Sequence, residues 1–404
     1  MQYTIGQLAE IIDGDRGINY PKMDEFHNNG FCLFLNTSNV TKDGFAFEDK
    51  QFITEEKDKI LRKGHLNRGD IVFTTRGTVG NVALYSVSVP YENMRINSGM
   101  VILRCRNSIV DTRFIYHLLK SKNCRTYIKS FCTGSAQPQL PIKNLSTIIL
   151  EIPSLQKQSK IADIVSAYDD LIETNQRQIK LLEETAQRLY KEWFVDMRFP
   201  GHENVQMIDG LPEGWKRTVF SERVDVLSGG TPKTSNPEYY NGSIPFYSPK
   251  DSDDRFFAFD TETHISESGL ENCSSKLYPE GTIIITARGT VGKTTILARP
   301  MAMNQSCYAL KSSEVMSIYY LFFALRQEIM ALKTMANGGV FDTIIVKTFD
   351  RIKLITPTDL LMQSFDKHVS PIMEKIKSLL IEIRYLSETR DRLLPKLMSG
   401  EIEV

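Results

Sequence analysis

The sequence has little of what several classes of protein require. Its six cysteines form no CxxC pair and have no histidine at zinc-ligand spacing, so we expect reduced thiols in a cytoplasmic compartment and no metal site. No run approaches the roughly 18 consecutive apolar residues of a membrane span. The first residues, MQYTIGQLAE, lack a basic segment followed by an apolar one, so no secretory signal is expected. With 404 residues, the chain is long enough for two or three globular domains.

The net charge is zero, which gives no global signal for a nucleic-acid partner. The charges are nevertheless uneven. Residues 95–143 contain a single acid, Asp111, and nine basic residues, which could form a phosphate-neutralising surface or a solvated helical face. These basic residues are Arg95, Arg104, Arg106, Arg113, Lys120, Lys122, Arg125, Lys129 and Lys143.

The chain contains an internal repeat. Residues 69–80 read GDIVFTTRGTVG and residues 281–292 read GTIIITARGTVG. Towards the C-terminus the identities settle at a constant separation of 204 positions, as for Ile172 and Ile376. The sequence therefore predicts a tandem duplication of about 200 residues, whose halves differ by insertions in surface loops.

Each half predicts the same α+β order of elements. Short β-type runs alternate with Gly, Pro and Asn breaks, a helical stretch follows at 112–131 or 315–335, and a long helix begins after Pro153 or Pro357. We expect two similar mixed α/β domains joined by two long, coiled-coil-like helices. The expected boundaries are 1–154 for the first domain, 155–197 for the first helical spacer, 198–358 for the second domain and 359–404 for the second spacer.

Both long helices carry an apolar stripe that requires a partner helix, and the repeat supplies one within the chain. At one position of this seam Asn175 replaces an apolar residue, either to fix the register or because it is solvated. The predicted seam residues are Ile161, Tyr168, Leu182 and Leu189 in the first helix, and Phe365, Ile372, Leu379, Leu386 and Leu393 in the second.

Motifs that would carry catalysis are incomplete. Residues 287–294, ARGTVGKT, differ from a phosphate-binding loop by an alanine at the first position, and the first half has Asn81 in place of the lysine. The segment Asn236–Tyr239, NPEY, resembles the base-holding loop of adenine methyltransferases but has Glu238 at the second proline position, so a turn is the expected structure. No catalytic residues are predicted.

The repeated RGTVG element is the strongest candidate for contact with DNA. Arg76, Gly77 and Thr78 offer a guanidinium, a close approach of the backbone and a hydroxyl for a phosphate; the alternative is a tight turn in which the arginine pairs with a nearby acid such as Asp70. Gln137 and Gln139 could read base edges, although glutamines in such a loop are often only solvated. The other candidates are Lys22, Lys42 and Asn97 in the first half, and Thr231, Lys233, Lys250, Arg288, Gly289, Thr290, Lys293 and Asn304 in the second.

Several segments together resemble the specificity subunits of type I restriction–modification systems. They are DGDRGINYPK (13–22), NVTKDGF (39–45), TRGTVG (75–80), GSAQPQL (134–140), LYKEWFVDMRFPG (189–201), LPEGW (211–215), GGTPKTSNPEYYNGSIPFYSPKD (229–251) and LLPKLMSGEI (393–402). The resemblance covers essentially the whole chain. It implies two recognition domains, each reading one half of a bipartite DNA site, on two antiparallel helices that set the spacing.

The same resemblance implies the partners. Two methyltransferase subunits would dock on the helices, and translocase–endonuclease subunits would join for restriction. S-adenosylmethionine and ATP would bind those partners, and no cofactor would bind this chain. A stand-alone methyltransferase or nuclease, and a scaffold of some other assembly, are the rival classes; a methylation assay and a salt-dependent DNA-binding measurement would distinguish them.

Overall fold

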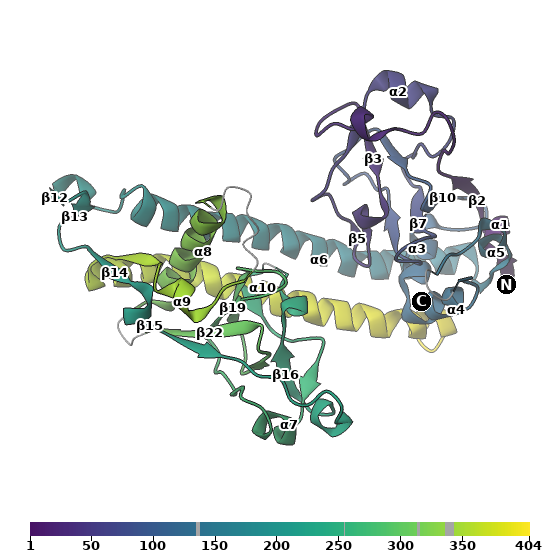
Figure 1. Ribbon diagram of the computed structural model, residues 1–404. Coiled ribbons are helices and arrows are strands. Elements are labelled where there is room, and N and C mark those ends of the chain that lie inside the picture. Colours follow the sequence, from purple (N-terminus) through teal and green to yellow (C-terminus); the bar gives the residue numbers. More distant parts are fainter. Residues whose placement is uncertain (135–137, 254, 313–315, 336–342) are drawn as a thin grey trace. The chain divides into compact units, whose positions relative to one another are not determined.

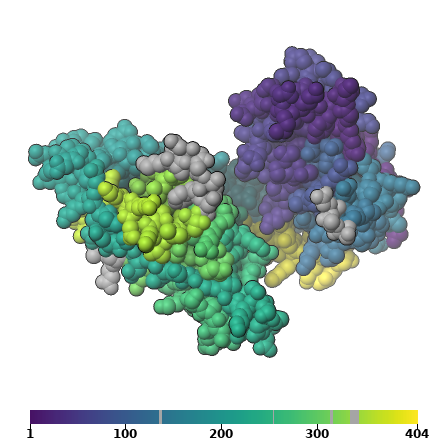
Figure 2. Space-filling view, viewed as in Figure 1, coloured from purple at the N-terminus to yellow at the C-terminus, as the bar shows by residue number. Residues whose placement is uncertain are grey.

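The computed structural model describes residues 1–134, 138–253, 255–312, 316–335 and 343–404. The chain forms two compact units: unit 1 comprises residues 1–174 and 383–404, and unit 2 comprises residues 175–382. The end of the chain therefore belongs to the same unit as its beginning. In Figure 2 the purple residues from the beginning of the chain form one continuous part of the surface of unit 1.

Unit 1 is built around a four-stranded antiparallel sheet. In spatial order its strands are β2 (Ala9–Asp13), β10 (Met100–Cys105), β7 (Ile71–Thr74) and β8 (Val82–Leu84). Because successive residues of a strand point to opposite faces, Phe73 and Leu103 belong to one core cluster, whereas Val72 and Ile102 belong to another. The first cluster is shared with helices and the second with a three-stranded sheet.

The remaining elements of unit 1 surround this sheet. The helical stretch expected at 112–131 is two helices, because Ser121 ends the first and caps the second by accepting a hydrogen bond from the N–H of Cys124 (3.3 Å). These elements are β1 (Gln2–Thr4), β3 (Cys32–Leu35), β4 (Val40–Thr41), β5 (Gly44–Phe45), β6 (Phe52–Ile53), β9 (Met94–Ile96), β11 (Ile149–Glu151), α1 (Ile5–Leu8), α2 (Glu55–Ile60), α3 (Thr112–Lys120), α4 (Lys122–Lys129) and α5 (Ile142–Thr147).

Unit 2 contains a five-stranded sheet with the order β15-β22-β19-β20-β17 and a three-stranded sheet with the order β18-β16-β21. Its helix α8 (Ile318–Met335) is apolar around much of its circumference, as expected for a helix that is buried. The other elements are β12 (Met207–Ile208), β13 (Leu211–Pro212), β14 (Lys216–Val219), β15 (Val224–Ser228), β16 (Ile244–Tyr247), β17 (Phe257–Ala258), β18 (His264–Ile265), β19 (Ile283–Thr286), β20 (Thr294–Leu297), β21 (Ala302–Met303), β22 (Cys307–Ser312), β23 (Lys353–Thr356), α7 (Glu267–Glu271) and α9 (Val346–Phe349).

The two units repeat one topology. The order β2-β10-β7-β8 in unit 1 recurs as β15-β22-β19-β20 in unit 2, and the set β6-β3-β9 recurs as β18-β16-β21. In both three-stranded sheets the central strand has one antiparallel and one parallel neighbour. The pair β1–β11 likewise recurs as β14–β23. The tandem repeat and the α+β class expected from the sequence are confirmed.

The two long helices are α6 (Leu155–Tyr190), which continues as one π-helical turn to Val195, and α10 (Asp359–Ser399) (Figure 1). Each begins two residues after the proline at which the sequence predicted a helix start, because proline restricts the preceding residue and ends the strand. Each helix also has one end in unit 1 and the other end in unit 2. Among the described residues, no helix is long and apolar enough to cross a membrane.

Candidate nucleic-acid interface

The RGTVG segment of unit 1 is a tight turn between β7 and β8. Thr74 closes it: its hydroxyl donates to the carbonyl of Thr78 (2.5 Å) and accepts from the N–H of Asn81 (2.9 Å). Gly77 and Gly80 have positive φ angles of 70° and 93°, which side chains with a Cβ rarely adopt. Arg76, Gly77 and Thr78 are exposed at the tip of this turn.

Arg76 is not engaged in the ion pair that the alternative interpretation required. Asp70 instead pairs with Arg104 (2.8 Å) and accepts the N–H of Asn67 (2.7 Å). Within the described part of the chain, Arg76 forms no ion pair. Its guanidinium therefore remains available to an external anion.

Two further segments meet at this turn. The backbone N–H groups of Thr75 and Arg76 donate to the carbonyl of Gly99 (2.9 and 3.1 Å), and the side chain of Asn97 accepts the N–H of Gly99 (2.9 Å). The N–H of Asn97 donates to Leu35 at the end of β3 (3.0 Å). We call this arrangement of the turn, the end of β3 and the Asn97–Gly99 loop the cradle of unit 1.

The cradle also includes the loop that contains Gln139. The backbones of Gln139 and Arg76 form a bridge, and the side chain of Gln139 is exposed. Gln137 lies outside the described residues, as does the counterpart loop 337–339 in unit 2. The fold thus brings Gln139 to the RGTVG turn, which the sequence did not predict, and its contact with base edges stays a prediction.

Unit 2 contains an equivalent cradle. Thr286 closes the turn by donating to the carbonyl of Thr290 and accepting the N–H of Lys293 (3.1 Å). The N–H of Ala287 donates to Ser306 (2.7 Å), and the N–H of Asn304 donates to Tyr247 at the end of β16 (2.9 Å). These bonds correspond one for one to those of unit 1, so the repeat preserves a backbone framework as well as a motif.

Several candidate residues of unit 2 lie on or next to this framework, whereas Lys233 shares no described hydrogen bond with it. Arg288, Gly289 and Thr290 are exposed at the tip of the turn, and the hydroxyl of Thr290 donates to the carbonyl of Pro249, next to the exposed Lys250 (3.3 Å). Lys293 donates to the carbonyl of Ser252 (3.3 Å). The hydroxyl of Thr231 donates to Gln305, which follows Asn304. Lys233 is exposed four residues before Pro237.

Two other candidates lie apart from the contacts that define the cradle of unit 1. Lys22 begins a short 3-10 helix, where its N–H donates to Glu25 (2.7 Å). Lys42 is exposed at the tip of the β4–β5 hairpin. Neither shares a described hydrogen bond with the RGTVG turn.

A pair of glycines was missed by the sequence analysis. A Cβ placed on Gly14 would lie 2.3 Å from the carbonyl oxygen of Asn97, and one on Gly229 would lie 2.1 Å from that of Asn304. Only glycine allows the chain to pass this close to the cradle. The available signal was the recurrence of glycine in DGDRG and GGTPK, although a turn would have explained it equally well.

The basic run at 95–143 is in large part internally neutralised. Arg95 is 6% exposed and pairs with Asp58 (2.5 Å), so interpreting it as surface charge was wrong. Arg104 pairs with Asp70, Arg113 pairs with Asp111 and Asp163 (2.8 and 2.7 Å), and Lys120 lies 3.8 Å from Asp169. Exposed basic residues of the run are Arg106, Lys122, Lys129 and Lys143.

Some of the predicted seam residues of the two long helices lie in unit 1 and the others lie in unit 2. Ile161 is buried in unit 1 with Val165, Leu394 and Leu397. In unit 2, Phe365 contacts Tyr190, Trp193, Phe194 and Phe323, and Leu379 is also buried. The remaining predicted seam residues, Tyr168, Leu182, Leu189, Ile372, Leu386 and Leu393, are half-buried.

Asn175 is buried in unit 2, and its side-chain nitrogen has no hydrogen-bond partner among the described residues. The solvated alternative for this residue is therefore wrong.

His117 of α3 lies against α6 in unit 1. Its Nε2 is 2.9 Å from the hydroxyl of Ser166, and the side chain is only 4% exposed. Burial lowers the pKa of His117 to about 4, since the attraction of Asp169 for the charged ring is too weak to offset it.

We expect this histidine to make unit 1 sensitive to mild acid. Between its unfolded pKa of about 6.5 and its folded pKa of about 4, the unfolded chain binds a proton that the folded chain does not. The free energy of unfolding of unit 1 should therefore decrease as the pH is lowered through this window, by about 3 kcal/mol in total. Hydrogen exchange of peptides from α3, compared between the wild type and H117Q, measures the effect. Tryptophan fluorescence would not, because both tryptophans lie in unit 2 and report on that unit. Equal pH dependence in the two proteins would contradict the assignment.

Comparisons with known proteins agree with the repeat. Residues 1–184 and 212–382 both match the family described as type I restriction modification DNA specificity domain. The chain is 27% identical to the type I restriction enzyme HindI specificity subunit of Haemophilus influenzae, over 99% of both chains. It is 28% identical to the MjaIX specificity subunit of Methanocaldococcus jannaschii, over 87% of this chain and 82% of that one.

The fold is also similar to a solved structure. The crystal structure of a type I restriction–modification S subunit from M. genitalium aligns with 98% of this chain and 96% of that one, with a TM-score of 0.58 and 17% identity. With both halves matched at the level of sequence and the shared fold in view, the chain belongs to the family of type I restriction–modification DNA specificity subunits.

Proposed function

We propose that each unit of this chain reads one half of a bipartite DNA site through its cradle. The observation that carries the proposal is that hydrogen bonds of the unit 1 cradle recur at equivalent positions in unit 2. This part of the framework is shared, whereas the surrounding side chains differ, for example Asn81 against Lys293 and Thr37 against Pro249. A constant framework with variable side chains suits a protein that must recognise two different short sequences.

Within each cradle, the exposed turn is suited to a phosphate group. Arg76 or Arg288 supplies a positive charge, and Gly77 or Gly289 leaves the backbone accessible. Gln139 and the side chains around the turn are then placed to meet base edges, since phosphate contacts fix position and base contacts specify sequence. Two such readers on one chain multiply the discrimination available to one.

The role of α6 and α10 follows from the same proposal. The helices set the number of unread base pairs between the half-sites and dock two methyltransferase subunits, which translocase–endonuclease subunits join for restriction. The chain itself is then not a catalyst, and S-adenosylmethionine and ATP bind its partners. A consistent observation is that apolar side chains, among them Leu171 and Tyr385, remain 49% and 65% exposed on these helices.

Single substitutions of the two arginines test the proposal. We expect R76A and R288A each to weaken DNA binding about tenfold and to reduce the slope of affinity against salt by about one, as the loss of one phosphate contact should. The measurement is a salt titration of DNA binding by the chain assembled with its methyltransferase subunits, on a site first identified by genome-wide mapping of methylated adenines. R106A, which removes an exposed arginine from the turn before α3, is the matched control.

The dependence of the defect on sequence is a second readout. Because a phosphate contact carries no sequence information, R76A and R288A should each weaken binding by a similar factor on the natural site and on sites with a single base changed. Binding by R76A and R288A equal to that of R106A would rule out the cradles as the DNA-binding elements.

A further inference from the structure

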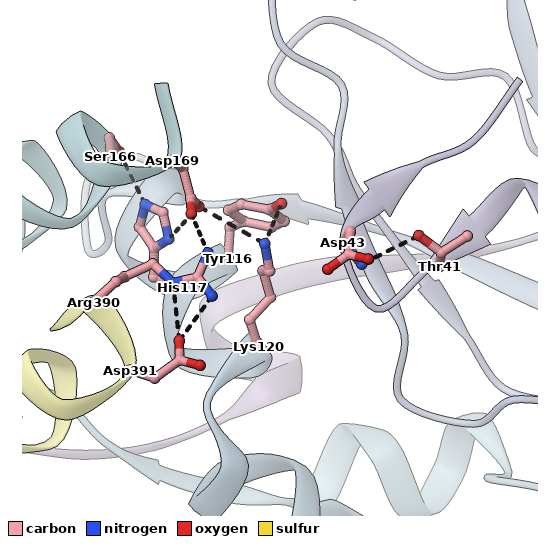
Figure 3. A network of polar contacts seen from close by, with 9 residues as sticks. All are labelled: Thr41, Asp43, Tyr116, His117, Lys120, Ser166, Asp169, Arg390 and Asp391. Carbon is pink, nitrogen blue, oxygen red and sulfur yellow. Dashed lines mark hydrogen bonds and ion pairs between the residues drawn. The ribbon is translucent and has the colours of Figure 1, made fainter. Parts of the chain in front are cut away.

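The two ends of the helix pair are packed in chemically different ways. In unit 2 the contacts are aromatic: Tyr190 and Phe194 of the first helical segment meet Phe365 of α10 and Tyr320 of α8. In unit 1 the equivalent positions hold the apolar Leu394 and Ile161, and the helices and α3 share in addition a network of charged and polar side chains (Figure 3). The repeat alone would make the two ends alike, so this difference requires a reason.

Asp169 of α6 is the centre of the network in unit 1. Its Oδ1 pairs with Nη1 of Arg390 on α10 (2.5 Å), and its Oδ2 lies 3.4 Å from Nδ1 of His117 and 3.8 Å from Nζ of Lys120. Figure 3 shows these side chains directed towards one another from three helices. Burial opposes ionisation of Asp169, but the positive charges of Lys120 and Arg390 outweigh it, and the pKa of its carboxyl lies below its usual value.

The repeat identifies what occupies the same positions at the other end. At the constant separation of 204 residues, Asp169 corresponds to Met373 and Arg390 corresponds to Ala186. Both Met373 and Ala186 are fully buried in unit 2. One end of the helix pair thus carries an ion pair at a position where the other end carries two apolar side chains.

This difference matters because α6 and α10 both carry an apolar stripe, so the stripes alone do not determine which helix pairs with which. Two copies of the chain could in principle pair α6 with α6 and α10 with α10. By the same register, Asp169 of one copy would then face Ala186 of the other, and Arg390 would face Met373. Each such contact leaves a partly buried charge without its partner, which is strongly unfavourable.

We propose that the Asp169–Arg390 pair is a pairing determinant, which directs α6 to α10 of its own chain and excludes association of two copies through like helices. Polar residues at single seam positions specify partners in helical coils in the same way, at some cost in stability. Lys120, 3.8 Å away on the third helix, adds a second positive charge beside the carboxylate, whose Oδ2 has no hydrogen-bond partner among the described residues. The pair acts on assembly of the chain and has no part in reading DNA.

The test removes the difference between the two ends. The double variant D169M/R390A gives unit 1 the side chains that unit 2 already accommodates at these positions. The wild type and the variant are unfolded in urea, refolded at about 10 µM and about 500 µM, and analysed by size-exclusion chromatography with light scattering. K396A/E401A, which removes an exposed pair between Lys396 and Glu401 (2.9 Å), is the control.

We expect the wild type and the control to refold as monomers at both concentrations. The double variant should form dimers whose share rises with concentration, to tens of per cent near the millimolar effective concentration of linked segments. Its dimers should persist on dilution, because exchanged helices separate only by unfolding. Should the charge-free variant be hard to fold, D169N/R390Q removes the charges at nearly constant size and should dimerise in the same way. Monomeric refolding of both variants at 500 µM would overturn the proposal, as would a dimer that dissociates on simple dilution.

Discussion

Replacing Asp58 by alanine is expected to lower the free energy of unfolding of unit 1 by about 3–5 kcal/mol, the usual cost of leaving a buried charge without its partner. Arg95 is 6% exposed and donates to Oδ1 of Asp58 (2.5 Å) and to the carbonyls of Lys63, Asp58 and Leu61. The carbonyls alone cannot neutralise the guanidinium. Hydrogen exchange of peptides spanning 55–66 and 94–96 measures the loss.

Two further variants separate the ion pair from a general effect of mutation. D24A removes an exposed acid from the same unit and should change stability by less than about 0.5 kcal/mol. D58A/R95M removes both charges and should recover much of the stability, because replacing both partners by apolar groups is far less costly than removing one. Equal stability of D58A and D24A would show that Arg95 does not depend on Asp58.

Lengthening both helices is expected to abolish methylation at the natural sites and to create methylation at sites with a longer spacer. Four residues inserted after Asn175 and four after Leu379 add about 6 Å of rise and about 40° of rotation to each helix. One base pair adds about 3.4 Å and roughly 34–36° of rotation. If the helices fix the distance between the recognition domains, the spacer should grow by one or two base pairs while both half-sequences stay the same.

Genome-wide mapping of methylated adenines in a host that carries the variant chain with its partner subunits gives the outcome directly. Insertion in α6 alone is the control. It shifts the apolar stripe of α6 out of register with that of α10, so it should lower the stability of the protein without defining a new spacer length. An unchanged spacer in the double insertion would refute the idea that the helices act as a ruler.

The sequence was sufficient for the features that recur locally. The repeat at 69–80 and 281–292 predicted two units of one topology, and the apolar stripes predicted both long helices to within a few residues of their observed ends. These features are encoded in short-range periodicity and in similarity between segments, so no long-range contact is needed to detect them.

The features that were missed depend on contacts between distant residues. Arg95 reads as surface charge until Asp58, 37 positions earlier, is seen to neutralise it. Gly14 reads as an ordinary turn residue until the backbone of Asn97 is found in contact with it. Arg76 and Asn97 were both selected from the sequence, but only the fold brings them to one cradle; their contact with DNA stays a prediction.

The shared helices also have a consequence for the order in which the protein can form during its synthesis. Domains at the beginning of a chain usually fold while the remainder is still on the ribosome. Here the core of unit 1 includes Leu394 and Leu397, so the apolar side of α6 around Ile161 and Val165 stays uncovered until these residues have been made. Residues 175–382 of unit 2 are contiguous and are all made before residue 383, so the first unit to be started is the last whose segments are all present.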